Sequence, residues 1–139
     1  CSYAGKPDCY VNESGDVLRQ WVQSLDVDPQ SILVVYDDFS LDIGTLRLRP
    51  SGSDGGHRGL GSIIDRLGTQ DIPRLRIGIG PIPSSQDPAD FVLSPMTDTD
   101  RKHLHSVTQR VPDILKDIER DGFDRAMNEW NGEEIRARR

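Results

Sequence analysis

The sequence predicts an α/β fold in a single domain, and three observations support this prediction. Segments with the period of an amphipathic helix alternate along the chain with short runs typical of strands. The length of 139 residues suits one domain with a moderate core. The hydrophobic content of 35% and the mean hydropathy of −0.56 are typical of a water-soluble chain. We therefore expect residues 1–139 to form one domain.

The first expected element is a helix that follows two residues of the types that cap helix N-termini, Asn12 and Ser14. Apolar residues then recur at helical spacing as far as Leu25. We expect the helix to end near Pro29, because proline does not continue a helix.

Two strands are expected next. Residues 31–36 form a β-branched run without alternation, which is typical of a strand buried on both faces. Asp37 follows this run, at the strand end where ligands bind in open α/β sheets. Residues 45–49 alternate apolar and basic, which predicts a half-buried strand with Arg47 and Arg49 on one face.

The remaining elements are expected on the same grounds. They comprise a helix after a glycine-rich turn, a strand ending at glycines, a short extended piece, a long helix and a last short helix. The expected ranges are 60–67, 74–80, 91–93, 98–118 and 123–130. Pro112 is expected to kink the long helix. Residues 132–139 are expected to form a basic tail that frays.

The charge distribution bears on possible partners. The formal net charge of −6 argues against non-specific nucleic-acid binding by the chain as a whole. Arginines nevertheless crowd the middle of the sequence, which predicts a local basic face. The alternative is a solvated surface on which these arginines pair with acidic residues. The arginines concerned are Arg47, Arg49, Arg58, Arg66, Arg74 and Arg76.

Cysteine usage and hydropathy bear on the compartment. Cys1 and Cys9 do not make a disulfide framework, and no metal-binding cluster is visible in the sequence. No apolar run is long enough to span a bilayer, and no leader is visible at the start. We therefore expect a cytoplasmic protein without a membrane partner, a metal or another cofactor.

The stretch 52–60 is the most informative part of the chain. It places glycines on both sides of His57, directly after the basic strand and directly before a helix. Glycines allow a ligand to approach the backbone closely, and free N–H groups at a helix start suit an anion. The pattern therefore indicates an anion-facing functional loop. An ordinary flexible connection between strand and helix is the alternative.

Three side chains are candidates for a shared site. Asn12 offers an amide, Asp37 a carboxylate, and His57 an imidazole whose pKa suits proton transfer near neutrality. Each has a structural alternative: Asn12 could cap its helix, Asp37 or Asp38 a turn, and His57 could be a packed histidine. No serine or cysteine has a recognisable partner, so a covalent mechanism is not supported.

Residues 6–15, 52–60 and 67–80 together resemble motifs of the bacterial-type peptidyl-tRNA hydrolase family. Residues 6–15 (KPDCYVNESG) are similar to its KP-x-T-Y-M-N-x-S-G motif, and residues 52–60 to its glycine loop ending in GGHNGL. Residues 67–80 match its LGTQDFPRLRIGIG segment closely. The motifs follow the family's order over essentially the whole chain. Further similar segments are 34–41, 91–94 and 125–128.

The resemblance implies a twisted mixed sheet flanked by helices, and hydrolysis of the ester that joins a peptide to tRNA, which recycles the tRNA. It implies a monomer, with neither a metal nor a covalent intermediate. Asp37 would orient the catalytic base, and Asn12 would hold the substrate. His57 would line the groove for the peptide and the 3′ adenosine. The residues implied to contact substrate or tRNA are Tyr10, Asn12, Arg47, Arg49, Gly55, Gly56 and Arg58.

The chain also departs from the family pattern. The family's first strand, its GNPG turn and the helix carrying its catalytic histidine precede the region that this chain resembles. We therefore expect a shortened N-terminus, with no counterpart of that base in these residues. Arg58 stands where the family has an asparagine that holds the reacting water, and arginine cannot accept a hydrogen bond. Tyr36 replaces the family's histidine before Asp37.

Two alternatives stay open on the sequence alone. The chain could be a catalytically impaired module that binds RNA or a protein partner on the same fold, in the cytoplasm or in an organelle. His57 could serve as a substitute base beside Asp37, provided that it comes within hydrogen-bond reach of the reacting water.

Overall fold

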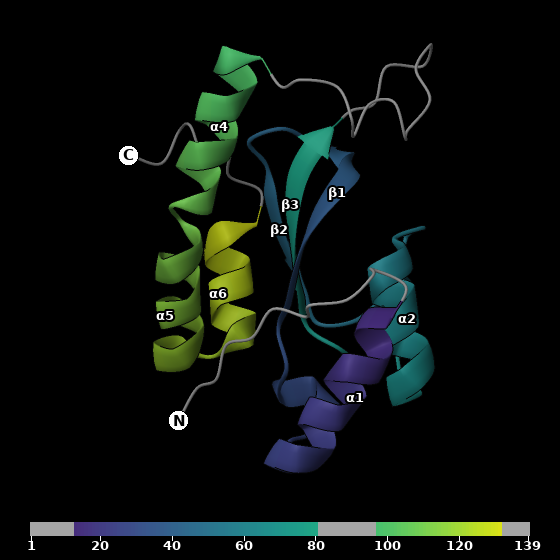
Figure 1. Ribbon diagram of the computed structural model, residues 1–139. Coiled ribbons are helices and arrows are strands. Elements are labelled where there is room, and N and C mark those ends of the chain that lie inside the picture. Colours follow the sequence, from purple (N-terminus) through teal and green to yellow (C-terminus); the bar gives the residue numbers. More distant parts are fainter. Residues whose placement is uncertain (1–12, 81–96, 132–139) are drawn as a thin grey trace. The chain divides into compact units, whose positions relative to one another are not determined.

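The computed structural model describes residues 13–80 and 97–131, which divide into two compact units (Figure 1). Residues 13–34 and 50–73 form the first unit. Residues 35–49, 74–80 and 97–131 form the second. Each unit is described by itself.

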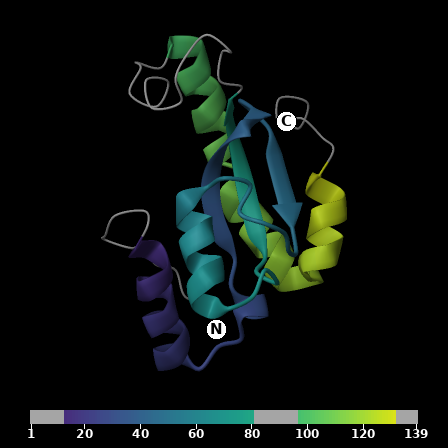
Figure 2. The ribbon, with the colours of Figure 1, turned by 90° about the vertical axis from the view of Figure 1, so that its right-hand side faces the viewer.

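A pair of packed helices dominates the first unit (Figure 2). Helix α1 spans Ser14–Leu25 and helix α2 spans Arg58–Leu67. The two approach closely at Gly15, which is buried and whose amide donates a 2.9 Å hydrogen bond to Ser62 Oγ. A Cβ atom at Gly15 would collide with the backbone carbonyl of Ser62. Glycine is therefore required at this contact.

The region after α1 differs slightly from the expectation. The helix is confirmed, but it ends at Leu25 because Asp26 adopts the left-handed conformation, with φ 51°. A short 3₁₀ helix, η2, then spans Pro29–Ser31. The Asp28 side chain caps it by accepting a 3.0 Å hydrogen bond from the amide of Gln30.

A mixed three-stranded sheet forms the centre of the second unit. Strands β1 (Val34–Asp42), β2 (Leu46–Arg49) and β3 (Arg74–Gly80) lie in the order β1-β3-β2. β2 is antiparallel to β3, and β1 points the same way as β3 in Figure 1. The ranges expected for β2 and β3 are confirmed, β2 with one residue fewer. Together with the helices, this sheet confirms the α/β class.

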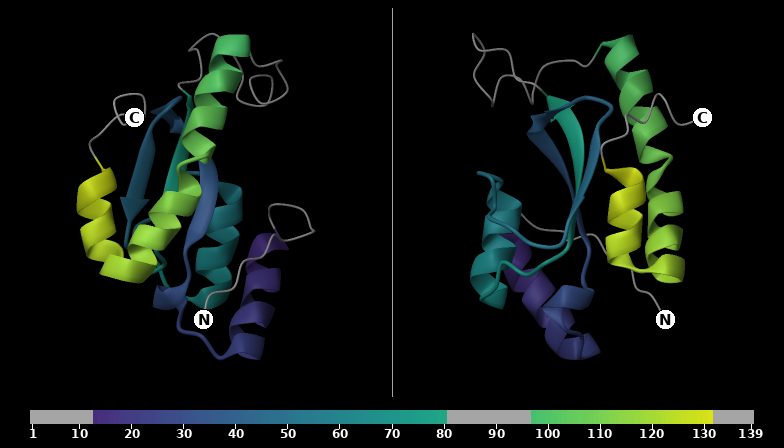
Figure 3. Two further views of the ribbon diagram at one scale, coloured as in Figure 1. Left: turned by 90° about the vertical axis from the view of Figure 1, so that its left-hand side faces the viewer. Right: turned by 180° about the vertical axis from the view of Figure 1, so that it is seen from behind.

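Three helices lie on one side of this sheet (Figure 3). They are α4 (Asp98–Thr108), α5 (Val111–Asp121) and α6 (Phe123–Trp130). The fully buried side chains of the unit belong to these helices and to the sheet. Those below 2% exposure are Leu46, Leu48, Leu75, Val107, Ile114 and Ala126. The core of the second unit therefore lies between sheet and helices.

Two side-chain contacts tie α6 and the residue after it to the rest of this unit. Trp130 Nε1 donates a 3.0 Å hydrogen bond to Asp117 Oδ2 on α5. The side-chain amide of Asn131 bonds to the backbone of Leu48 in both directions. Its Oδ1 accepts from the Leu48 amide at 2.7 Å, and its Nδ2 donates to the Leu48 carbonyl at 2.8 Å.

The expected long helix over 98–118 is wrong in its continuity. The chain leaves α4 at Gln109 and begins α5 at Val111, with Pro112 in the first turn of the new helix. Proline is well tolerated in a first turn, because its missing N–H would have no partner inside the helix there. Pro112 thus starts a helix instead of kinking one.

The first strand is also longer and less buried than expected. β1 begins at Val34, not at residue 31, and continues through Asp37 to Asp42. Its residues alternate between half-buried and exposed positions for much of its length, so the strand is not covered on both faces. Within the part of the chain that the structure describes, β1 is an edge strand, which explains its exposure. The predicted segments 91–93 and 132–139 lie outside the described residues.

Candidate functional site

The sheet of the second unit carries a basic face made of four arginines on neighbouring strands. The register pairs Arg47 with Arg76 and Arg49 with Arg74. Side chains of directly opposed residues lie on the same face of a sheet, so all four emerge together, opposite to the buried leucines of β2. We call these four residues the arginine face. It agrees only in part with the basic surface expected from the sequence, because Arg74 is buried, Arg76 pairs with Asp38, and Arg66 of the first unit pairs with Asp16.

Asp38 anchors one end of the arginine face to β1. Its Oδ2 accepts a 2.8 Å hydrogen bond from Arg76 Nε, within an ion pair that is largely shielded from water. Its Oδ1 accepts from the amide of Ser40 at 2.8 Å and from Ser40 Oγ at 2.6 Å. Arg76 also donates to Ser40 Oγ at 2.9 Å. Both oxygens of this carboxylate are therefore engaged.

These contacts determine the pKa of Asp38. Burial acts to raise it, while the hydrogen bonds from Ser40 and the guanidinium of Arg76 act to lower it. The lowering effects together are larger, so the pKa of Asp38 lies below its usual value of 3.8. The carboxylate form is the one that this cluster stabilises.

Tyr36 forms the corresponding contact with Arg74. Arg74 is 2% exposed, and its guanidinium shares a side-chain hydrogen bond with the tyrosine. Burial raises the pKa of the Tyr36 phenol above its ordinary value of 10.0, although nearby Arg76 and Arg74 act in the opposite direction. Tyr36 is therefore a neutral hydrogen-bonding group at physiological pH.

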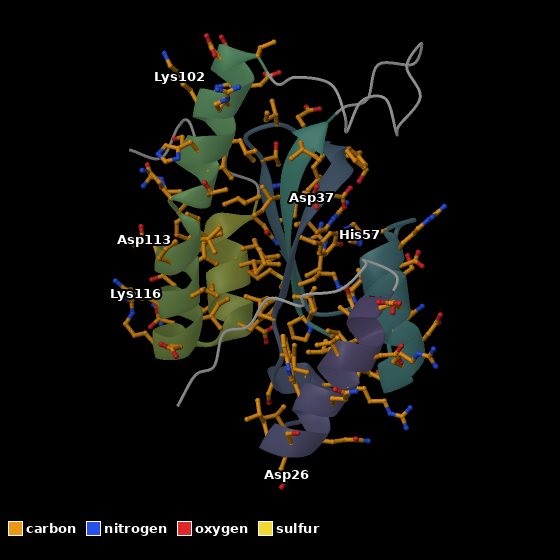
Figure 4. The ribbon with its side chains drawn as sticks, in the orientation of Figure 1. Asp26, Asp37, His57, Lys102, Asp113 and Lys116 are labelled. Carbon is orange, nitrogen blue, oxygen red and sulfur yellow. The ribbon has the colours of Figure 1, made fainter. Side chains whose placement is uncertain are left out.

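Asp37 lies between these two anchored residues, in the middle of β1 (Figure 4). The expectation that it stands at a strand end is wrong, because β1 continues for five residues beyond it to Asp42. Strand alternation places its side chain on the opposite face from Tyr36 and Asp38. Asp37 is exposed, so its carboxylate can meet a substrate from solvent.

The glycine loop of the first unit is a tight turn that Asp54 holds together. Gly55 and Gly56 have φ values of 59° and 86°, which L-residues with side chains rarely adopt. The amide of Gly56 donates to Asp54 Oδ1, and the amide of His57 donates to the Asp54 carbonyl, each at 2.9 Å. The glycines are therefore required by the backbone as well as by any ligand.

His57 is the N-cap of α2 (Figure 4). Its Nδ1 accepts a 3.1 Å hydrogen bond from the amide of Leu60. A neutral imidazole with an accepting Nδ1 carries its proton on Nε2, which then acts as a donor. This arrangement leaves no basic nitrogen for a water molecule, so it argues against His57 as a substitute base. Arg58 follows as the exposed first residue of α2.

The structure brings the predicted residues together in two groups. Arg47 and Arg49 share the arginine face, and the residues 55–58 share the junction of loop and α2. Asp37 belongs to the second unit and the glycine loop to the first, and each is placed within its own unit. Tyr10 and Asn12 lie outside the described residues.

Sequence reasoning missed the roles of Arg74, Arg76, Asp38 and Ser40. The alternation in the expected strand 74–80 places both arginines on one face, which was a usable signal. The register between β2 and β3 is what joins them to Arg47 and Arg49, and a single sequence does not give that register.

The described residues offer neither of two other kinds of site. Among the described residues, no three His, Cys, Asp or Glu side chains gather as metal ligands would. No helix in the described ranges is both long and apolar enough to cross a membrane.

Comparison with known proteins gives a consistent result. The model of the peptidyl-tRNA hydrolase family matches residues 3–138. The peptidyl-tRNA hydrolase of Caldicellulosiruptor saccharolyticus is 41% identical over 130 residues, covering 94% of this chain and 68% of its own length. That of Chloroflexus aggregans is 45% identical over 130 residues, covering 91% and 68%.

A solved structure is similar in fold. The crystal structure of peptidyl-tRNA hydrolase from Acinetobacter baumannii superimposes with a TM-score of 0.84 at 26% sequence identity. The match covers 93% of this chain and 65% of that one. The chain thus spans about two thirds of the length of the proteins that it matches.

Proposed function

Because the chain belongs to the peptidyl-tRNA hydrolase family, we propose that it hydrolyses the ester bond between a peptide and the 3′ ribose of tRNA. In this reaction a water molecule attacks the ester carbonyl, the 3′ oxygen leaves, and the products are a free peptide and a reusable tRNA. A base removes the proton of the water. No metal, cofactor or covalent intermediate takes part in the proposed reaction.

The observation that carries this proposal is the exposed carboxylate of Asp37 on β1. The side chains before and after it, those of Tyr36 and Asp38, contact Arg74 and Arg76. A carboxylate accepts hydrogen bonds, so it can hold an imidazole in the correct orientation and stabilise the charge that develops on it. We assign this orienting role to Asp37. The base itself is not assigned to His57, whose Nδ1 already caps α2.

The glycine loop supplies the substrate contacts in this proposal. We assign His57 to this loop's substrate contacts on the strength of the family motif that it matches. Gly55 and Gly56 have no side chains and leave the backbone open to close approach. We assign Tyr10, Asn12 and Arg58 to substrate binding as well, on the strength of the family motifs that they match.

The arginine face supplies the contacts with the tRNA backbone. Guanidinium groups suit phosphates because their donors form a planar fork. Phosphate contacts position a nucleic acid without reading its sequence, as an enzyme acting on many tRNAs requires. We assign Arg47 and Arg49 to this role. Arg49 is exposed and Arg47 is half-buried, and among the described residues each guanidinium donates a hydrogen bond to the carbonyl of the residue before it.

Two broader proposals follow from the family. The two compact units belong to one domain, since the family model runs through both without a break. The protein acts as a cytoplasmic monomer, in the compartment where peptidyl-tRNA arises.

The test is an assay of hydrolysis on an N-acetylated aminoacyl-tRNA. It uses this chain and a chimaera in which the opening strand and histidine-bearing helix of the Acinetobacter baumannii relative precede Cys1. We expect Asp37→Ala to lower kcat by about 100-fold or more, because the base loses its orienting partner. Asp42→Ala removes an exposed carboxylate from the same strand and should leave kcat unchanged. Absence of hydrolysis by both proteins would refute the proposal.

A second candidate function is that of an RNA-binding module without catalysis. Arg58 favours it, because an arginine cannot accept the hydrogen bonds with which an asparagine would hold the reacting water. This candidate predicts tRNA binding that weakens linearly with the logarithm of salt concentration, with no ester cleavage in either protein. Loss of turnover in Asp37→Ala would contradict it.

A further inference from the structure

We propose that Arg74 and Arg76 are positioning residues for Asp37, acting through the side chains on either side of it. This inference rests on the proposed function, in which Asp37 is the orienting carboxylate. It assigns to β3 a role beyond phosphate binding: two cross-strand contacts clamp the segment of β1 that presents the carboxylate.

The first step of the argument is the placement of the contacts. The residue before Asp37 is Tyr36, which shares a hydrogen bond with Arg74. The residue after it is Asp38, which forms the 2.8 Å ion pair with Arg76. The two contacts therefore straddle Asp37 and join β1 to the same neighbouring strand. Neither involves the Asp37 side chain, which alternation places on the other face.

The second step is the strength of these contacts. Arg74 is 2% exposed, and a buried guanidinium that loses its partner is strongly disfavoured. In the other contact, the side chains of Arg76 and Asp38 are only 24% and 15% exposed. Charged hydrogen bonds in such a setting are stronger and more directional than exposed ion pairs. The clamp thus restrains the backbone on both sides of residue 37.

The third step is the behaviour of Asp38. Ser40 donates two hydrogen bonds to Oδ1 while Arg76 donates to Oδ2, so three of the about four acceptor sites of this carboxylate are already used. Ser40 in turn accepts a hydrogen bond from Arg76 at 2.9 Å. Asp38, Ser40 and Arg76 form a closed cluster, which fixes one rotamer of Asp38 and with it the strand at Asp37.

The consequence for catalysis is geometric. An orienting carboxylate must hold its partner in one direction, and an error of about 1 Å can cost about 100-fold in rate. A carboxylate on an exposed edge strand needs restraint from its neighbours to meet this demand. Loosening the clamp should therefore lower kcat without weakening substrate binding.

The catalytic test is a double-mutant cycle on whichever of the two proteins turns over substrate. We expect Asp38→Ala to lower kcat by about 10- to 100-fold without raising KM. Arg76→Ala should lower kcat to a similar extent, and the double variant no further, since both remove one contact. Asp42→Ala is the matched control with unchanged kcat. Additive losses in the double variant, or an unchanged kcat in Asp38→Ala, would overturn the proposal.

A readout independent of turnover separates this inference from the proposed function. Amide hydrogen exchange at residues 36–39 should speed up in Asp38→Ala and not in Asp42→Ala. If Asp38→Ala does not fold, Ser40→Ala removes part of the same cluster and should act in the same direction. Unchanged exchange overturns the clamp even in an active enzyme. Faster exchange in a protein without turnover supports the clamp while refuting the proposed function.

Discussion

Two adjacent carboxylates, Asp37 and Asp38, show how much depends on a single residue. In sequence they are equivalent, and either could end a turn or serve a reaction. In the structure Asp38 is bound by Ser40 and Arg76, whereas Asp37 is exposed on the other face of β1. Alternation places their side chains on opposite faces of the strand, but only the pairing with β3 brings Arg76 to Asp38. That pairing is a tertiary fact, which a single sequence does not contain.

The bound state of Asp38 predicts a pH dependence of stability. Its pKa is lower in the folded protein than in the unfolded chain, where it lies near 3.8. Its contribution is therefore fully present above pH 3.8 and is lost as pH falls through the lower, folded value. We expect Asp38→Asn to lower Tm at pH 7, and the difference from the wild type to shrink as the pH falls below 3.8 and then through the lower pKa of the folded protein. Thermal unfolding followed by circular dichroism measures this, and a gap in Tm that does not change with pH would contradict it.

His57 illustrates a different limit at the same scale. The sequence placed it in a glycine-rich turn directly before a helix, and the structure confirms this placement. Whether such a histidine caps the helix or serves as a base depends on which ring nitrogen is occupied. The Leu60 amide decides this by donating to Nδ1, and that contact exists only once α2 has formed.

At the scale of elements, periodicity predicted type better than extent. The ranges of β3 and α6 agree with the expectation, because strong patterns end there at glycines or at polar residues. The break between α4 and α5 was missed because apolar residues keep their helical spacing across it. The extension of β1 was missed because its polar residues are of the types common in turns. In the structure Arg76 of the neighbouring strand pairs with one of them, Asp38.

The contact between α1 and α2 predicts the outcome of one substitution. Alanine favours a helix by about 1 kcal/mol over glycine, so Gly15→Ala would stabilise an isolated α1. In the protein the new Cβ collides with the Ser62 carbonyl, which is backbone and does not yield easily. We expect a net loss of about 1 to 3 kcal/mol in the free energy of unfolding. Gln20→Ala, at an exposed position of α1, is the control and should change it by less than about 0.5 kcal/mol.

Urea unfolding measures both variants of α1. The glycine variant should lower the midpoint of the transition while the control does not. A Gly15→Ala protein as stable as the wild type would show that the two helices separate readily at this contact.

At the scale of the whole molecule, the net charge disfavours binding to a nucleic acid, whereas the local charge on the sheet favours it. The chain carries a net charge of −6, which by itself argues against non-specific binding to nucleic acid. The arginine face concentrates positive charge on β2 and β3, while acidic residues are distributed over other elements. The family could be predicted from the sequence, because its motifs and their order along the chain can be recognised without a structure. The face was only partly predictable, because it depends on strand register.

The arginine face predicts how binding to tRNA responds to salt. Each phosphate contact contributes about 1 to the slope of log Kd against log salt concentration. Arg49→Ala should therefore weaken binding and reduce that slope by about 1. Arg101→Ala removes an exposed arginine from α4, away from the sheet face, and should leave the slope unchanged. Equal slopes for Arg49→Ala and the wild type would remove Arg49 from the proposed interface.

The asparagine that follows α6 has a consequence for how copies of this protein behave in a crowded solution. Unpaired N–H and C=O groups along the edge of a sheet can form hydrogen bonds with strands of other molecules, which leads to aggregation. Asn131 satisfies both peptide groups of Leu48 with its own side chain, in the way that a further strand would. One residue thus blocks the addition of a foreign strand at the middle of β2, and helps to keep a short basic strand from becoming a template for assembly.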